Sequence, residues 1–284
     1  YALLRREPNY ELSMLREYKV FYEREWLQGL SNTFSFYNRR IKPTRYLKFR
    51  RQLGDDTYLL EEDITTSELV INTRWSKDEE FLYGKFERIS LGSKWPVFNL
   101  NVHIGLNNFL KSDYEYYKLD FNIHDNIFLN PFGYTKVIIN GGKIWGQLPF
   151  PLLKLHEGNE TYAYDIYAFN MMNYYEFASD IYMRAYFEHH LEGFFFNRVP
   201  LFRKLKWREV GSINALVGDL NSKHRNELVF PETLHGLTKP YVEASLGVEN
   251  IFKFIRIDAM WRLSYLDNPD APKFGLRAKF KIDF

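Results

Sequence analysis

The chain has 284 residues, a formal net charge of +2 and an aromatic content of 18%. This nearly neutral charge gives no reason to expect nucleic acid or an acidic partner. The absence of cysteine excludes disulfide frameworks, thiolate metal sites and cysteine nucleophiles, and no apolar run approaches the roughly 18–20 residues of a membrane-spanning helix.

Apolar and polar residues alternate along most of the chain, which predicts β-strands with two chemically different faces. The pattern is clearest in the last residues, FGLRAKFKIDF, where every second residue is apolar. No long segment shows a helical period. In chain order, about twelve strands are expected, at 17–27, 31–42, 69–75, 80–91, 98–107, 117–124, 134–145, 181–191, 206–218, 241–249, 257–265 and 274–284.

Two architectures fit this alternation: a soluble β-protein with its apolar face inside, or a transmembrane barrel with its apolar face toward lipid. Several strands run to about 9–12 residues, longer than the soluble norm of about 5–6. The polar faces carry many charges and amides, and aromatic residues crowd the strand ends, as in the girdles of membrane barrels. We therefore expect an all-β fold, an antiparallel transmembrane outer-membrane β-barrel, and a soluble β-protein stays the alternative.

The connections can be threaded from a last strand that runs toward the periplasm. The longest connection, 146–178, is then extracellular, and its aromatic and methionine content predicts that it is folded. It is expected either to plug or gate the lumen or to form a surface cap. The candidate lumen or gating residues are Lys154, His156, Glu157, Gly158, Asn159 and Glu160.

The same threading places two other connections at the periplasmic end. Segment 192–205 is apolar and basic enough to rest on a membrane surface. Connection 43–64 is long for a periplasmic turn, because such turns are usually short.

Ionisable residues recur on the polar faces of the expected strands. They most simply form a salt-bridged, hydrated lumen, and a role in ion selectivity is the second interpretation. The expected lumen-facing charges are Arg74, Lys118, Asp120, Arg184, Glu188, Glu243, Asp258, Arg262, Arg277 and Lys279.

No catalytic, cofactor-binding or metal-binding constellation is expected. His189 and His190 are adjacent in a strand and point to opposite faces, so they cannot hold one ion together. The sequence has no legible glycine-rich phosphate loop, nucleophile elbow or Ser–His–Asp order. We expect a protein that is not an enzyme.

Several long blocks resemble a Bacteroidota outer-membrane family, whose members are usually named carboxypeptidase-regulatory-like domain-containing proteins and carry a barrel domain of unknown function. These blocks are 5–14, 86–100, 151–180, 187–201 and 239–269. The resemblance implies that residues 1–284 form one outer-membrane β-barrel domain, the C-terminal part of a longer protein.

That family is distantly similar to the bacterial surface-antigen superfamily of insertases and translocases, whose barrels have sixteen strands. The similarity implies that this chain is the C-terminal part of such a barrel, and that 146–178 is the loop that folds into the lumen. The superfamily loop carries an Arg-Gly tip motif, whereas 146–178 contains no arginine. Outer-membrane barrels also end on an aromatic strand that the assembly machinery reads, which implies an assembly signal at Phe280, Ile282 and Phe284.

The expected function is that of a plugged pore in the bacterial outer membrane, which transports or inserts protein or lipid. The alternatives are a structural or accessory barrel subunit of a larger envelope complex and a small-solute porin. The expected partners are outer-membrane lipid, the barrel assembly machinery and other envelope proteins, without nucleic acid or cofactors.

Overall fold

The computed structural model describes Arg5 and residues 11–54, 57–85 and 88–280. Within this part of the chain, no helix is both long and apolar enough to cross a membrane. Ile282 and Phe284 of the expected assembly signal lie outside the described residues.

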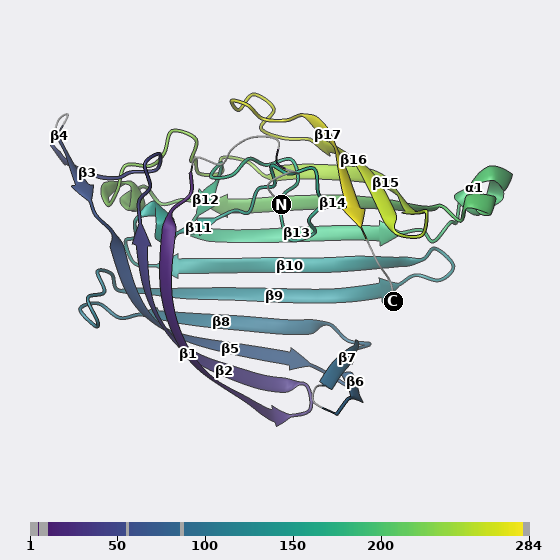
Figure 1. Ribbon diagram of the computed structural model, residues 1–284, viewed down its shortest axis with the longest axis horizontal. Helices are drawn as coiled ribbons and strands as arrows, with labels where there is room; N and C mark the ends of the chain where they lie inside the picture. Colours follow the sequence, from purple (N-terminus) through teal and green to yellow (C-terminus); the bar gives the residue numbers. More distant parts are fainter. Residues whose placement is uncertain (1–4, 6–10, 55–56, 86–87, 281–284) are drawn as a thin grey trace.

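One antiparallel sheet of eleven strands dominates the fold, and its spatial order follows the chain. Figure 1 shows the strands side by side from β1 to β17. Each strand pairs only with the previous and the next sheet strand, so every connection is a simple reversal. The strands are β1 (Met14–Leu27), β2 (Leu30–Lys42), β5 (Ile64–Ser76), β8 (Val97–Gly105), β9 (Tyr116–Phe128), β10 (Tyr134–Trp145), β13 (Ile181–His190), β14 (Arg208–Asp219), β15 (Tyr241–Ile251), β16 (Ile255–Arg262) and β17 (Phe274–Phe280).

The remaining elements are short and lie in the connections. Three two-stranded pairs stand apart from the main sheet: β3 (Phe49–Gly54) with β4 (Thr57–Glu61), β6 (Glu80–Tyr83) with β7 (Arg88–Gly92), and β11 (Lys154–Leu155) with β12 (Ala178–Ser179). The helical segments are η2 (Phe150–Leu152), η3 (Phe196–Arg198), α1 (Pro200–Leu205) and η4 (Ser222–Asn226).

The strand expected at 80–91 is wrong as a member of the sheet. The chain reverses after Tyr83, which pairs with Arg88, so the alternating residues form the small hairpin β6–β7. β5 pairs directly with β8. The main sheet therefore has eleven strands, against about twelve expected.

With one strand fewer, connection 43–63 lies at the opposite end of the sheet from the periplasmic end expected for it. Phe49 packs against Phe150 of the long connection, and Arg51 forms an ion pair with Glu227 at 3.2 Å. The long connections 43–63, 106–115, 146–180 and 220–240 thus share one end, the loop end. The connections 77–96, 129–133, 191–207 and 252–254 share the other, the turn end (Figure 1).

The two faces of the sheet differ as the alternation predicted. Leu276 is 56% exposed and Phe280 66% exposed, whereas Arg277 between them is 2% exposed. On β13, Met183 and Phe187 are exposed and Arg184 and Glu188 are buried. Apolar side chains therefore cover an open outer face, and charged side chains line a covered inner face.

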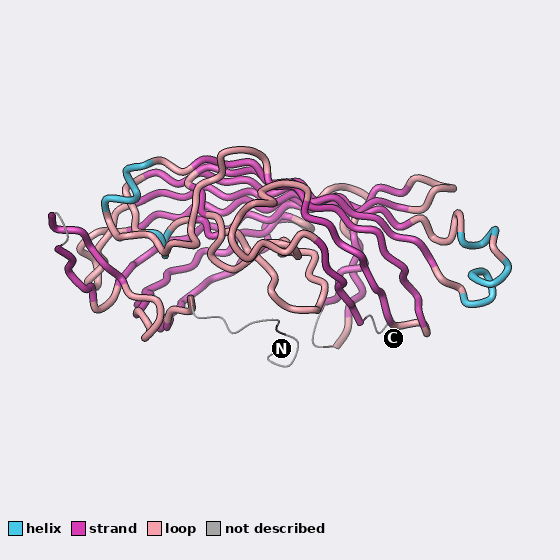
Figure 2. Tube along the Cα trace, turned by 90° about the horizontal axis from the view of Figure 1, so that it is seen from above, coloured by secondary structure: helices cyan, strands magenta, loops and turns pink. Residues whose placement is uncertain are grey.

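The sheet is strongly curved, and the loops fill its hollow side (Figure 2). Among the described residues, β1 and β17 each pair with one strand only, so the sheet does not close into a barrel. All residues of β1 are exposed. The all-β antiparallel fold is confirmed, and closure is not found in this part of the chain.

Candidate functional site

The candidate site is the inner face of the sheet together with the connection 146–180 that covers it, hereafter the inner loop. Phe169, Met172 and Phe177 of the inner loop are fully buried, and they pack with Leu216 and Tyr241 of the sheet. Burial of each large apolar side chain contributes about 1.5–3 kcal/mol relative to exposure. The inner loop is therefore folded, as the sequence predicted.

A buried ion pair fixes the inner loop to β16. Arg262 Nη2 donates to Glu176 Oε1 at 2.5 Å, and Arg262 Nη1 donates to Glu176 Oε2 at 3.0 Å. The same guanidinium donates to the carbonyl of Met171 at 3.2 Å. A bidentate pair of this kind is specific in direction as well as strong.

A buried carboxylate holds the neighbouring turn of the inner loop. Glu243 on β15 accepts hydrogen bonds from the backbone N–H groups of Asn170 and Met171, at 2.9 and 3.0 Å. Arg277 on β17 donates to the carbonyl of Asn170. The peptide at 170–171 is thus held by an anion on one side and a cation on the other.

Arg184 on β13 completes these anchors. Its guanidinium donates to the carbonyls of Ile166 and Tyr167, at 3.0 and 2.5 Å, and its Nε donates to Asn214. The sheet therefore supplies the arginines, and the inner loop supplies carbonyls and one carboxylate. This explains how a loop without arginine is held against a charged inner face.

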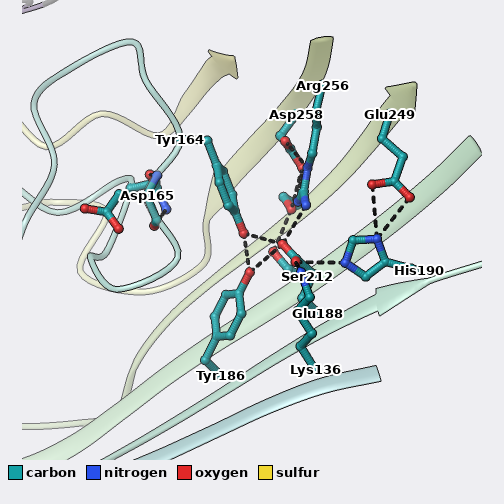
Figure 3. A network of polar contacts seen from close by, with 12 residues as sticks. Lys136, Tyr164, Asp165, Tyr186, Glu188, His190, Ser212, Glu249, Arg256 and Asp258 are labelled. Atoms are coloured by element: carbon teal, nitrogen blue, oxygen red, sulfur yellow. Dashed lines mark hydrogen bonds and ion pairs between the residues drawn. The ribbon is translucent and has the colours of Figure 1, made fainter. Parts of the chain in front are cut away.

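A second polar network lies beside the inner loop, nearer the turn end (Figure 3). Glu188 on β13 accepts from Tyr164 and Tyr186 at 2.7 Å each and pairs with Arg256 at 2.7 Å and with His190 at 2.9 Å. The network extends from Arg256 to Asp258 and from His190 to Glu249. Tyr164 connects the inner loop to this network.

The inner loop also covers part of the free edge of β17. The N–H of Tyr164 donates to the carbonyl of Ala278 at 2.8 Å, and the N–H of Ala278 donates to the carbonyl of Tyr162 at 2.9 Å. These bonds occupy backbone groups that would otherwise be available to another strand.

The predicted loop residues lie within the inner loop but do not reach the anchoring charges. Lys154 pairs with Glu157 at 2.5 Å, and His156 bonds Ser179 at 2.9 Å. Asn159 donates to the carbonyl of Ala163 at 2.7 Å, and Glu160 accepts from the N–H of Tyr174 at 2.9 Å. These contacts shape the loop internally, and their role in gating stays a prediction.

Gly158 lies where two backbone segments of the inner loop come close together. It forms a parallel bridge with Phe169. A β-carbon at this position would lie 2.3 Å from the carbonyl oxygen of Asn173. Only glycine allows the backbones to approach so closely.

The ten expected lumen charges lie in varied surroundings. Arg184, Glu188, Glu243, Asp258, Arg262 and Arg277 are buried. Lys118 donates to the carbonyl of Leu152, Asp120 accepts from Tyr182, Arg74 pairs with Glu79, and Lys279 lies over the ring of Tyr164. The part of the inner face under the loop is therefore packed.

Sequence reasoning missed the loop residues that meet these charges, namely 166–171 and Glu176, and the network members Tyr164, Tyr186, His190 and Arg256. Tyr186 and His190 are two residues from Glu188 on the same face of β13, and Arg256 is two residues from Asp258 on the same face of β16. Extending the alternation would therefore have found them. Position 176 had no such signal, because it lies outside any regular strand.

His190 is buried on the inner face, and His189 bonds Thr135 from the other face, as expected. Among the described residues, no group of three or more His, Asp or Glu could hold a metal ion.

The model of a family described as "Family of unknown function (DUF5686) C-terminal domain" matches residues 13–230. The chain belongs to this DUF5686 C-terminal domain family. The Bacteroidota origin and the carboxypeptidase-regulatory-like naming of the resembling family stay predictions.

Among solved structures, the chain is similar to BamA from Haemophilus ducreyi lacking POTRA domains 1–3, with a TM-score of 0.55 and 10% sequence identity. The alignment covers 94% of this chain and 54% of that one. The chain thus spans about half the length of that protein, and the likeness establishes a shared fold. No curated protein matches.

In this DUF5686 domain, we predict that Arg262→Ala undocks the inner loop around Glu176. Removal of one partner of a buried pair costs about 3–5 kcal/mol, because the other charge stays buried without compensation. Hydrogen exchange of the backbone amides of 166–176 should accelerate. Arg208→Ala is the matched control, because Arg208 and Glu192 are 3.6 Å apart and about half exposed, a pair worth less than about 1 kcal/mol. Unchanged exchange in Arg262→Ala would contradict the anchoring role.

We also predict that Gly158→Ala destabilises the inner loop by about 1–3 kcal/mol, because the added β-carbon overlaps backbone atoms. Gly54→Ala is the control, since a β-carbon there meets no atom within 4 Å. Thermal unfolding of both variants measures the difference. Equal melting temperatures would show that the inner loop is not packed at Gly158.

Acid should loosen the inner loop through His156. Burial, reinforced by Lys154 and Arg184, lowers the pKa of His156 from 6.5 to about 3. An undocked His156 binds a proton more readily, so docking is strongest above pH 6.5 and weakens as the pH falls toward 3. At pH 4.5 the loss is about 3 kcal/mol.

The measurement is hydrogen exchange of the inner loop at pH 7.5 and pH 4.5, corrected for the intrinsic rate. In the wild type, the corrected exchange rate at pH 4.5 should exceed that at pH 7.5. The ratio of these two rates should be smaller in His156→Gln, because glutamine cannot take up the proton. A ratio equal to that of the wild type would assign the acid response to other groups.

Proposed function

We propose that this domain is part of an outer-membrane β-barrel, a pore plugged by the inner loop that transports or inserts protein or lipid at the outer membrane, and that it is not an enzyme. One observation carries this proposal: the sheet is apolar on its open outer face and charged on its covered inner face. A soluble β-protein has the opposite arrangement. Lipid requires an apolar outer surface and a closed set of backbone hydrogen bonds.

The open edges of the sheet support a barrel larger than the described strands. β1 has no partner on its outer side among these strands, and its residues are exposed on both faces. Further strands would pair with the free edge of β1 and with the part of β17 that the inner loop leaves uncovered. The assembly machinery and neighbouring envelope proteins are the proposed partners.

The long anchored inner loop favours a plugged pore over an open porin. An ion pair binds it to β16, a carboxylate on β15 accepts from its backbone, and arginines on β13 and β17 donate to its carbonyls. A second candidate is a structural subunit of an envelope complex, which the same dense packing would suit.

Planar-bilayer recording on the full-length protein tests the proposal. The wild type should conduct weakly, and both Arg262→Ala and a deletion of 157–176 should conduct more, since the first undocks the plug and the second removes it. Arg208→Ala should match the wild type. Silence in all variants, with a partner co-purifying, would favour the structural subunit, and equal high conductance in all would favour a porin.

A further inference from the structure

The apolar outer face of the sheet is not uniform, because a groove of about 740 Å³ lies near its turn end. The groove runs across β13, β14 and β15, and Phe187, Leu246 and Trp261 are among its walls. Its volume falls within the ~300–1,000 Å³ of typical ligand sites.

Gly211 on β14 lines the groove and contributes no side chain to it. Gly211 lies opposite His189 on one neighbour and Leu246 on the other. A β-carbon at Gly211 would lie 3.5 Å from the Leu246 side chain. A long side chain at this position would therefore fill the groove.

The connection 191–207 closes the groove at the turn end. Phe196 of this connection lines the groove. Glu209 fixes it there, because its Oε1 accepts hydrogen bonds from the backbone N–H groups of Phe195, at 2.8 Å, and Phe196. The other oxygen, Oε2, is buried without a hydrogen-bond partner among the described residues, so this end of the groove offers an acceptor to a donor from outside.

The same connection is strongly basic and partly apolar on its surface. Phe195, Leu201 and Leu205 are exposed. Glu192 is the acidic residue in 191–208, against the basic residues Arg198, Arg203, Lys204, Lys206 and Arg208. Basic residues at a membrane interface attract anionic headgroups.

We propose that this groove binds an anionic phospholipid, with one acyl chain along Gly211 and the phosphate against the basic connection. The apolar lining suits an acyl chain and would not retain a free phosphate, and the adjacent positive charge selects an anionic headgroup. A glycerol headgroup also carries hydroxyl groups that could donate a hydrogen bond to Glu209 Oε2. The inference rests on the membrane placement of the proposed function, since only a lipid-facing surface meets acyl chains.

Native mass spectrometry of the full-length protein in detergent tests the site, with phosphatidylglycerol and phosphatidylcholine of identical chains as probes. The wild type should retain one phosphatidylglycerol in preference to phosphatidylcholine. Gly211→Leu should weaken this retention about tenfold or more, because leucine occupies the path of the chain. Ala215→Leu, which places the same side chain four residues away on the outer face of β14, should leave the retention unchanged.

The headgroup contact is tested separately on exposed positions that do not endanger folding. The pair Arg203→Gln and Lys204→Gln should abolish the preference for phosphatidylglycerol, whereas Lys48→Gln and Lys111→Gln at the loop end should preserve it. Equal retention of both lipids by the wild type, or wild-type retention in Gly211→Leu, would overturn the groove. Failure of the wild type to incorporate into liposomes of either lipid would instead overturn the membrane placement.

Discussion

The pairing of buried charges on the inner face is the constraint on which the structure depends. Arg184, Glu243, Arg262 and Arg277 are each less than a tenth exposed. A buried charge without a partner costs several kcal/mol. The inner face of these strands can therefore exclude water only if another segment provides polar atoms for the charges. The inner loop supplies carbonyls, N–H groups and Glu176 at those places. The sheet and the inner loop are therefore one unit, and the arginines belong to the sheet.

This division of roles explains why the inner loop can be rich in aromatic residues. The hydrogen bonds that the charges of the sheet need come from the loop backbone and a few loop side chains. Phe169, Met172 and Phe177 can therefore fill the space between the anchors. The outer face needs no such cover if lipid contacts it. The groove at Gly211 is then a local departure from a smooth lipid-facing surface, placed beside the basic connection.

Much of the fold could be predicted from the sequence, because alternation reports directly on the two faces of a strand. It identified all eleven sheet strands, with β1 three residues short at its start, but it could not distinguish a sheet strand from a hairpin. Segment 80–91 alternates like its neighbours, yet it folds back on itself. The charges of the inner face were also predictable from the alternation. Their partners were not, because the irregular path of 157–176 has no period, and Glu176 meets Arg262 across 86 residues of chain.

Water access to single cysteines tests the central claim most directly, since the chain has no cysteine of its own. Met183→Cys lies on the outer face of β13, where Met183 is 47% exposed, and Lys111→Cys lies at the loop end. In intact membranes, a water-soluble maleimide should label Lys111→Cys and spare Met183→Cys until detergent is added. Labelling of Met183→Cys as fast as Lys111→Cys in the same membranes would contradict the account.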